Sequence, residues 1–324
     1  LPEVTVKDGK TVLPEEEYKW ECDTSSPTAA GTYTITVTDA PGGNYDLTGV
    51  TNRTATFTIG QIPQEELVIG GKPSATNYGD SFQLTVSGGS GSGAVTWKAT
   101  GPASVDTSGN VTITGVGEVT ITVEKAADTN YIAAQTQWTF TAAPKPVTAD
   151  IVAASRDYDG TTDATVTSAG IDSADLVDSS DVVTIDKTSI TAAFDTPSVG
   201  TGKTVKLDTS KVQVTGDDAD KYAIRYPDTV TADITQATTS INTQPQGISS
   251  LEYTGQPQAL VTAGETNVGF IVYSLEQNGT YTTEIPTGTN AGMYTVYYKV
   301  DGTADYTAEP GGSITVTIDP KTIT

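Results

Sequence analysis

Clustered carboxylates are the side chains of this sequence best suited to hold a metal ion. Two turns carry them, one with Asp157, Asp159 and Asp163 and one with Asp217, Asp218 and Asp220. Calcium takes about six to eight oxygen ligands at roughly 2.3–2.6 Å, and such groups often supply them. Neither turn ends in the Glu that completes an EF-hand loop, and Asp is itself a favoured turn residue. The sequence therefore favours plain turn formation, and we expect no metal and no cofactor.

Two further acidic series contain the carboxylates that acid/base catalysis would need. Asp172, Asp175, Asp178 and Asp181 recur every three residues, a pattern typical of a solvated face. Glu15–Glu17 is a run of three adjacent acids, which could serve proton transfer but which is typical of an exposed loop. Neither series predicts a catalytic site.

Trp20, Trp97 and Trp138 are the candidates for stacking against a sugar ring. Trp97 ends an alternating segment that begins at Ala94, which would be the second or third strand of a sandwich. Sandwich domains commonly bury a Trp at that place. We therefore expect Trp97 in a core, and the sequence leaves the places of Trp20 and Trp138 open.

Residue types that most active sites need are missing or rare. The 324 residues contain no His, the usual proton-transfer group near neutral pH and the commonest transition-metal ligand. The single cysteine, Cys22, allows no internal disulfide, and we expect it as a small buried apolar side chain. Residues 146–236 contain no Asn, which excludes a Lys–Asn isopeptide bond within them. We predict no catalytic residue and no enzyme activity.

The charge balance disfavours two kinds of partner. With 17 basic and 40 acidic residues the chain carries a formal net charge of −23, which repels nucleic acid and anionic lipid. No run of apolar residues approaches the ~18 needed to span a membrane. We expect no nucleic-acid partner, no membrane insertion within these residues, and a monomer.

Composition and alternation predict strands throughout. About 60 residues are Thr, and segments such as Ser81–Val86, Asn110–Ile113 and Val119–Val123 alternate polar with apolar side chains. Such segments suit half-buried strands, and Gly, Pro, Asn and Asp separate them. Helical periodicity is nowhere sustained, with the exception of one turn expected around Ser173–Val177. The sequence predicts an all-β chain.

An internal repeat organises the chain. Three segments run from a glycine through an alternating strand to an Asn-Tyr or Asp-Tyr pair and a final strand. The interval from this glycine to this tyrosine is 14 residues each time, in Gly31–Tyr45, Gly117–Tyr131 and Gly292–Tyr306. A variant with a longer loop runs from Gly202 to Tyr222. The same local structure is therefore expected four times.

Cutting after each final strand gives four domains, here called repeats 1 to 4. They span residues 1–60, 61–145, 146–236 and 237–324, with short connections and no Gly/Ser tether. Repeat 1 is short because Leu1–Val6 aligns with Pro257–Val261 of repeat 4, so an equivalent of Leu251–Gly255 is missing. Residues 320–324 resemble the start of a further repeat. We therefore expect this sequence to be a piece of a longer array of repeats.

The strand pattern is typical of tandem immunoglobulin-like antiparallel β-sandwich domains. Tyr33 and Tyr294 each stand two residues after a glycine at the entry to a late strand. This placement predicts a tyrosine corner, in which the phenol hydroxyl bonds to backbone upstream.

Three families resemble parts of the chain. Residues 146–236, with Arg156-Asp157-Tyr158-Asp159-Gly160-Thr161, resemble the YDG repeat. Repeats 1 and 4, with Ala-Gly-x-Tyr strands and Tyr253–Pro257, resemble MBG-type repeats, repeat 1 without its opening strand. Residues 61–145, with the Gly/Ser run Ser87–Gly93 before Val95-Thr96-Trp97 and with Asp106–Asn110 before a strand, resemble a bacterial Ig-like domain but carry Val119 where the corner Tyr is expected.

These resemblances imply a location and a role. Such arrays are stalks, adhesins and cell-wall-associated scaffolds, so the expected location is extracellular, at the bacterial cell surface. The expected function is a non-catalytic structural or interaction segment, with host or cell-wall glycans or surface proteins as partners. A carbohydrate-binding or ligand-binding adhesin module is the alternative, and converging aromatic and polar side chains in a concave pocket would favour it.

The repeats are predicted to form an elongated array. Strands of six to eight residues span roughly 20–27 Å, so each repeat should be about 35–40 Å long and four in line about 140 Å. Small-angle X-ray scattering should give a maximum dimension near this value. A maximum dimension close to that of a 324-residue sphere would refute the prediction.

Overall fold

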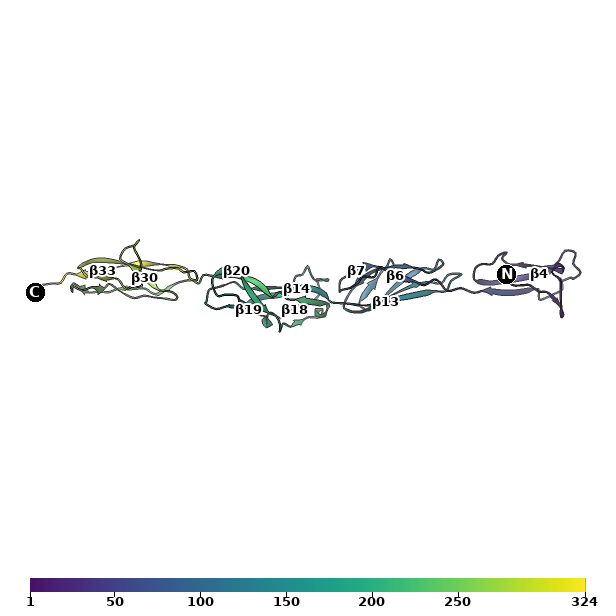
Figure 1. Cartoon of the computed structure of the whole chain (residues 1–324), viewed down its shortest axis with the longest axis horizontal. Helices are drawn as coiled ribbons and strands as arrows, with labels where there is room; N and C mark the ends of the chain where they lie inside the picture. The colour runs from purple at the N-terminus through teal and green to yellow at the C-terminus, as the bar shows by residue number, and fades with distance from the viewer. Residues whose placement is uncertain (324) are drawn as a thin grey trace. The chain divides into compact units, whose positions relative to one another are not determined.

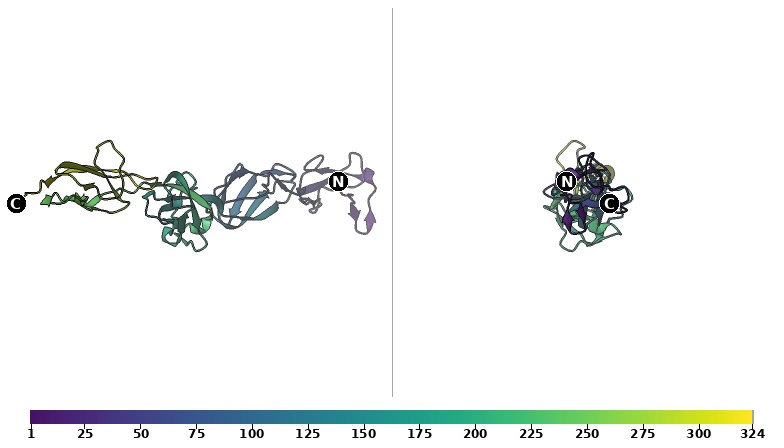
Figure 2. Two further views of the ribbon diagram at one scale, coloured as in Figure 1. Left: turned by 60° about the vertical axis from the view of Figure 1, so that its left-hand side comes forward. Right: turned by 90° about the vertical axis from the view of Figure 1, so that its right-hand side faces the viewer.

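The computed structural model describes residues 1–323, and its regular structure is almost entirely β. Three short 3-10 turns, Glu15–Glu17, Lys187–Ser189 and Ala219–Lys221, accompany the strands in this part of the chain. Figures 1 and 2 show strands and loops in every repeat and no long helix. In the described residues no helix is long and apolar enough to cross a membrane.

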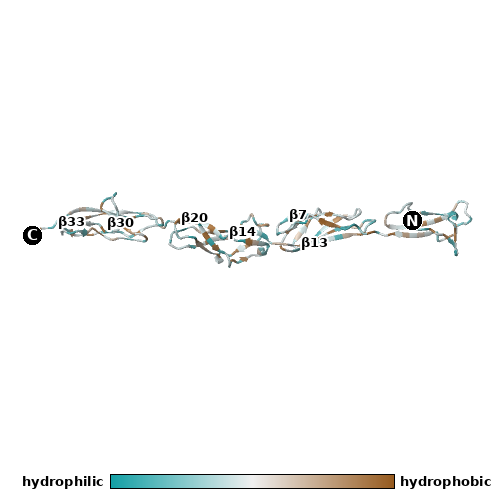
Figure 3. Ribbon diagram, viewed as in Figure 1, coloured by the Kyte–Doolittle hydropathy of each residue, from teal (hydrophilic) through white to brown (hydrophobic). Residues whose placement is uncertain are grey.

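The chain divides into two compact units. The first holds residues 1–146 together with 220–223, and the second holds residues 147–219 and 224–324. Repeats 1 and 2 therefore fall in the first unit, and repeat 4 and most of repeat 3 fall in the second. In Figure 3 apolar residues concentrate on strands, for example between β20 and β14, while loops are mostly hydrophilic.

Repeat 1 is a small domain with one main sheet. Its strands are β1 (Lys7–Asp8), β2 (Thr11–Val12), β3 (Tyr18–Cys22), β4 (Gly31–Asp39) and β5 (Thr54–Ile59). The main sheet has the order β3-β4-β5, so β5 is an edge strand. Its core cluster has three buried members, Leu13, Tyr18 and Leu47.

Repeat 2 is a fuller sandwich. Its strands are β6 (Val68–Gly70), β7 (Ser81–Gln83), β8 (Thr85–Ser87), β9 (Val95–Thr100), β10 (Ala103–Val105), β11 (Asn110–Ile113), β12 (Gly117–Lys125) and β13 (Ala134–Ala142). The sheet β10-β11-β7 and the sheet β13-β12-β9 contribute residues to a single core of nine buried side chains. Val119, Ile121 and Val123 from β12 lie in this core, as their alternation predicts.

The segment Ser81–Val86 differs from its prediction as one strand. It forms two strands in two sheets, because β7 pairs with β11 while β8 pairs with β6. The change occurs at Leu84, which is 1% exposed and donates its N–H to Gly109 O (2.8 Å). Polar and apolar residues alternate in the same way before and after the chain passes from one sheet to the other, so the sequence pattern does not reveal the change of sheet.

Repeat 3 holds three sheets and two core clusters. Its strands are β14 (Lys145–Ala153), β15 (Arg156–Asp157), β16 (Asp163–Ala164), β17 (Val166–Ile171), β18 (Thr184–Ile185), β19 (Thr191–Phe194), β20 (Gly200–Asp208), β21 (Val214–Thr215), β22 (Tyr222–Arg225) and β23 (Thr229–Thr235). The largest sheet has the order β15-β23-β20-β19-β16. The helical turn expected around Ser173–Val177 is wrong: Asp172 caps a reverse turn there by accepting from Ala174 N (2.9 Å).

Repeat 4 is built around one long hairpin. Its strands are β24 (Ile241–Thr243), β25 (Gln246–Gly247), β26 (Leu251–Glu252), β27 (Gln258–Ala259), β28 (Val261–Thr262), β29 (Glu265–Thr266), β30 (Ile271–Ser274), β31 (Thr287–Gly288), β32 (Gly292–Val300) and β33 (Glu309–Asp319). The main sheet has the order β26-β33-β32-β30. Nine buried residues form its core, including Leu260, Val296 and Ile318.

A short strand near the start of repeat 3 and of repeat 4 lies parallel to the last strand of that repeat, a feature that the antiparallel prediction missed. β15 pairs in parallel with β23, and β26 pairs in parallel with β33. A parallel bridge joins Asn77 to Ala143 at the same place in repeat 2. These pairings are one or two residues long, too short to leave a periodicity in the sequence.

The tyrosine corners form as predicted. Tyr33 Oη donates to Ala29 O (2.8 Å), and Tyr294 Oη donates to Asn290 O (2.8 Å). Asn290 N in turn donates to Tyr294 Oη (3.1 Å), so this hydroxyl both donates to and accepts from the backbone of Asn290. The phenol thereby ties the entry of the long strand to the loop before it.

Replacing Tyr294 with Phe removes these two bonds and should lower the free energy of opening of β32 and β33 by about 1 kcal/mol. Hydrogen exchange of the β32 and β33 amides measures this opening. Tyr297→Phe is the matched control in the same strand, because no hydrogen bond to its hydroxyl is present. Equal effects of the two substitutions would contradict the role assigned to the corner.

Candidate functional site at the polar turn and the repeat junctions

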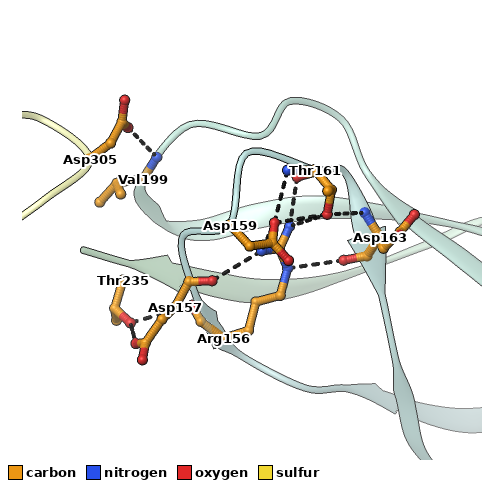
Figure 4. A network of polar contacts seen from close by, with 8 residues as sticks. All are labelled: Arg156, Asp157, Asp159, Thr161, Asp163, Val199, Thr235 and Asp305. Carbon is orange, nitrogen blue, oxygen red and sulfur yellow. Dashed lines mark hydrogen bonds and ion pairs between the residues drawn. The ribbon is translucent and has the colours of Figure 1, made fainter. Parts of the chain in front are cut away.

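The acidic turn of repeat 3 is organised around an arginine (Figure 4). Arg156 donates from Nε to Asp163 O (3.0 Å), from Nη1 to Asp157 O (3.0 Å) and from Nη2 to Thr161 O (2.6 Å). Its guanidinium carbon lies 5.3 Å from the centroid of the Phe194 ring. The guanidinium thus satisfies three backbone carbonyls of the turn at once.

Asp159 binds this arginine and shapes the turn. Its Oδ1 lies 2.5 Å from Arg156 Nη1 and accepts from Thr161 N (2.8 Å) and Thr161 Oγ1 (2.8 Å). The hydrogen bonds from Thr161 and the Arg156 charge lower the pKa of Asp159. Gly160 follows with φ of +81°, a conformation that favours glycine. The Asp-Gly pair is therefore required by the turn itself.

The three carboxylates of this turn do not converge on one point. Asp157 Oδ1 accepts from Thr235 Oγ1 (2.6 Å), on the side facing β23. Asp159 is turned toward Arg156, as Figure 4 shows. Within residues 1–323 no group of three or more His, Cys, Asp or Glu side chains is placed to hold a metal ion.

Three further residues from the acidic series act in local structure. Asp218 Oδ2 accepts from Val182 N (2.8 Å), which joins two loops of repeat 3. Asp178 caps its own turn by accepting from Ser180 N (2.9 Å). Glu17 differs from the exposed loop predicted for Glu15–Glu17, since it accepts from Asn44 N (2.5 Å) and Asn44 Nδ2 (2.7 Å). This carboxylate holds the Asn-Tyr loop of repeat 1.

The tryptophans lie at the edges of cores, and the cysteine is partly exposed. Trp97 and Trp138 pack half-buried against the repeat 2 cluster, and Trp20 packs against that of repeat 1. Trp138 stacks on Phe140 with ring centroids 4.1 Å apart. Cys22 is only half-buried, contrary to expectation, and its Sγ donates to Asp23 Oδ1 (3.4 Å).

The Asn-Tyr pair of repeat 2 contacts both the connection and repeat 1. Ile62 N donates to Asn130 O (2.9 Å), and Ile132 N donates to Ile62 O (3.0 Å). Gln61 Nε2 donates to Asp128 O (2.5 Å). Across the junction, Ala30 N of repeat 1 donates to Asn130 Oδ1 (2.8 Å). The connection is therefore fixed on the loop by hydrogen bonds.

The Asp-Tyr pair of repeat 4 makes the corresponding contacts with repeat 3. Ala237 N donates to Asp305 O (2.9 Å), and Thr307 N donates to Ala237 O (3.0 Å). Gln236 Nε2 donates to Thr303 O (2.7 Å). Across the junction, Val199 N of repeat 3 donates to Asp305 Oδ1 (3.4 Å), which Figure 4 shows beside the Arg156 network.

The two junctions use the same positions of the repeat. Each glutamine is the second residue after the final Ile of a strand, Ile59 or Ile234. The side chains of Asn130 and Asp305 each accept a hydrogen bond from a backbone N–H. In both cases the donor is the residue directly before the glycine that opens a long strand, β4 or β20. The 14-residue spacing found in the sequence is the length that places this side chain at the junction. We call this arrangement the junction latch.

An aromatic contact adds to the latch between repeats 3 and 4. Tyr158, the tyrosine of the polar turn, meets Tyr306 edge to face with ring centroids 5.3 Å apart and an interplanar angle of 86°. Burial of the hydroxyl, followed by the charge of Asp305, raises the pKa of Tyr158. The Arg156 turn therefore positions a junction residue.

These features define β-sandwich repeats with a short ordered connection between repeats 1 and 2 and another between repeats 3 and 4. Residues 143–232 match the YDG domain family. No curated protein sequence matches the chain.

Several solved surface proteins are similar at low identity. The Escherichia coli adhesin FdeC is 13% identical over 89% of this chain and 74% of its own, with a TM-score of 0.23. Surface layer protein SbsC, domains 1–6, is 15% identical over 99% of this chain and 50% of its own (TM-score 0.21). A SusE-like surface located polysaccharide binding protein from Bacteroides thetaiotaomicron is 12% identical over 97% and 83% (TM-score 0.18).

Calcium should have little effect on repeat 3, because Arg156 already supplies the positive charge at the polar turn. We expect its calorimetric melting temperature to change by less than a few degrees between millimolar calcium and excess chelator. Ion binding at 100 times its dissociation constant would add about 2.7 kcal/mol, several degrees for a domain of this size. A rise of that size that disappears in Asp218→Ala would contradict the prediction.

Proposed function

We propose that this chain is a non-catalytic structural and interaction segment of a bacterial cell-surface protein, in which the junction latch limits bending between neighbouring repeats. The observation that carries the proposal is the recurrence of one set of hydrogen bonds at two junctions. A connection without such bonds would behave as a flexible tether. The YDG match at residues 143–232 supports placing this chain among the repeat arrays of cell-surface proteins.

The finer domain assignment belongs to the same proposal. Repeats 1 and 4 are MBG-type domains and repeat 2 is a bacterial Ig-like domain. Both tyrosine corners support a sandwich of immunoglobulin type for repeats 1 and 4. The expected location is extracellular, and the expected partners are glycans or proteins of a cell surface.

The outer face of the repeat 2 sheet favours a spacer over a sugar-binding module. A shallow hollow of about 390 Å³ on β13-β12-β9 is lined by Thr96, Lys98, Thr100, Thr122, Glu124, Gln135 and Gln137. It contains no aromatic ring on which a sugar could stack. Phe82, Trp97, Trp138 and Phe140 of this repeat pack against its core instead.

Loss of the latch between repeats 3 and 4 should broaden their relative motion. Spin labels at the exposed positions Thr229 and Asn278, in a Cys22→Ser background, report the distance between the two repeats by electron paramagnetic resonance. In Asp305→Ala/Gln236→Ala the distance distribution should widen markedly, because the connection loses its side-chain bonds.

The matched control replaces an exposed glutamine of repeat 4 outside the connection, Gln244→Ala, whose side chain makes no hydrogen bond within the described residues. It should leave the distribution unchanged. A distribution that is equally broad in the unmodified chain and in the latch variant would disprove a role of the latch in limiting bending.

A further inference from the structure

Asp128 binds the connection with its backbone and the loop after it with its side chain. Its carbonyl accepts from Gln61 Nε2 (2.5 Å). Its Oδ1 accepts from Asn130 N (2.9 Å) and Tyr131 N (3.0 Å), and Asp128 N donates to Tyr131 O (3.0 Å). Residues 128–131, here called the latch loop of repeat 2, are therefore closed into a turn by their first residue.

Thr303 makes the same contacts in the latch loop of repeat 4, residues 303–306. Its carbonyl accepts from Gln236 Nε2 (2.7 Å). Its Oγ1 accepts from Asp305 N (3.2 Å) and Tyr306 N (3.1 Å), and Thr303 N donates to Tyr306 O (3.0 Å). A hydroxyl here and a carboxylate in repeat 2 thus take the same place, two residues before the side chain that accepts the bond across the junction.

The turn fixes the direction of that acceptor side chain. Asn130 is exposed, and without local bonds its backbone would sample many conformations. A side-chain oxygen that binds the N–H two positions on holds the backbone in one turn conformation. In this conformation Asn130 Oδ1 reaches Ala30 N of repeat 1 at 2.8 Å.

The glycine-rich run Ser87–Gly93 packs against Asp128. Ser92 donates from N (2.6 Å) and from Oγ (3.3 Å) to Asp128 Oδ2. Gly91 has φ of +71°, and a Cβ atom there would overlap Asp128 Oδ2 and lie 2.7 Å from Tyr131 Cδ2. Glycine is therefore required at this position, because the backbone of the run approaches the carboxylate closely.

The Asp128 carboxylate joins the glycine-rich run to the latch loop. It accepts in each of these side-chain contacts, as an ionised carboxylate does. The hydrogen bond from Ser92 N, followed by that from Asn130 N, lowers the pKa of Asp128. One oxygen thus binds the run and the other binds the loop.

We propose that Asp128 and Thr303 are the positioning residues of the two junction latches, and that the glycine-rich run acts on the junction of repeats 1 and 2 through Asp128. The inference rests on the proposed function, in which the latch limits bending. The side-chain bonds of both residues described above stay within their own repeat. Their effect on the junction therefore passes through Asn130 and Asp305.

Hydrogen exchange of the Ala30 amide in the full chain reports whether the latch is closed, because this amide donates to Asn130. Asp128→Ala should make this exchange about 10-fold faster. Asp128→Thr should restore slow exchange, since Thr303 holds the equivalent loop with a hydroxyl. If Asp128 served only to bind Ser92, threonine would not rescue the latch.

Gly91→Ala perturbs the carboxylate from the glycine-rich run. The added methyl group should displace Asp128 and accelerate exchange of the Ala30 amide, with much less effect in an Asp128→Thr background. Gly9→Ala is the matched control, because Gly9 also has a positive φ, +60°, but a Cβ atom there meets open space. Unchanged exchange of the β12 and β13 amides verifies that repeat 2 stays folded in each variant.

Bending is measured separately from latch closure. Spin labels at the exposed positions Thr36 and Glu118, in a Cys22→Ser background, report the distance between repeats 1 and 2 by electron paramagnetic resonance. The distance distribution should broaden in Asp128→Ala and in Asn130→Ala, and it should stay narrow in Asp128→Thr.

The two readouts separate this inference from the proposed function. Faster Ala30 exchange in Asn130→Ala but not in Asp128→Ala would overturn the positioning role and leave the proposed function standing. Equal exchange in Asp128→Ala and Asp128→Thr would overturn the positioning role as well. Faster Ala30 exchange in Asp128→Ala with an unchanged distance distribution would uphold the positioning role and contradict the proposed function.

Discussion

The pairing of two long neighbouring strands is the interaction on which each repeat depends. In repeats 1, 2 and 4 a glycine opens the first of these strands and faces the last residues of the second, as Gly31 faces Ile59 and Gly292 faces Ile318. This register places the hairpin loop at one end of the repeat and the opening glycine at the other. Because the latch acceptor sits in the loop and the N–H that it binds precedes a glycine, one hairpin supplies both halves of a head-to-tail contact.

Much of this could be predicted from the sequence, where the signal is a local pattern with a physical cause. Alternation predicts Asn110–Ile113 as a strand because a half-buried sheet demands it. The glycine-to-tyrosine interval predicts equal hairpins, and Tyr33 and Tyr294 predict corners. The short parallel strands, the crossing at Leu84 and the role of Gln61 and Gln236 depend on tertiary position. No sequence pattern marks a single glutamine in a connection as a hydrogen-bond donor. Its role becomes visible only when the position of the loop that accepts its hydrogen bond is known.

The acidic composition of repeat 3 has a structural explanation in its turns. Its 16 acidic residues are all Asp, the residue that caps turns by accepting from the N–H two positions on. Asp159, Asp172, Asp178 and Asp186 each do so. Hydrogen bonds within the turn lower the pKa of Asp159 and Asp186, so these turns lose stability when pH falls through the lowered pKa and keep it above the usual value near 3.8.

The parallel pairing of an early strand with the last strand has a mechanical consequence. Once a tensile force on repeat 3 or repeat 4 has released the strands that precede β15 or β26, it pulls two adjacent parallel strands in opposite directions along their length. The hydrogen bonds between them are then loaded together in shear and do not break one after another. Along one chain, resistance to stretching would thus depend on the length of this parallel pairing in each repeat.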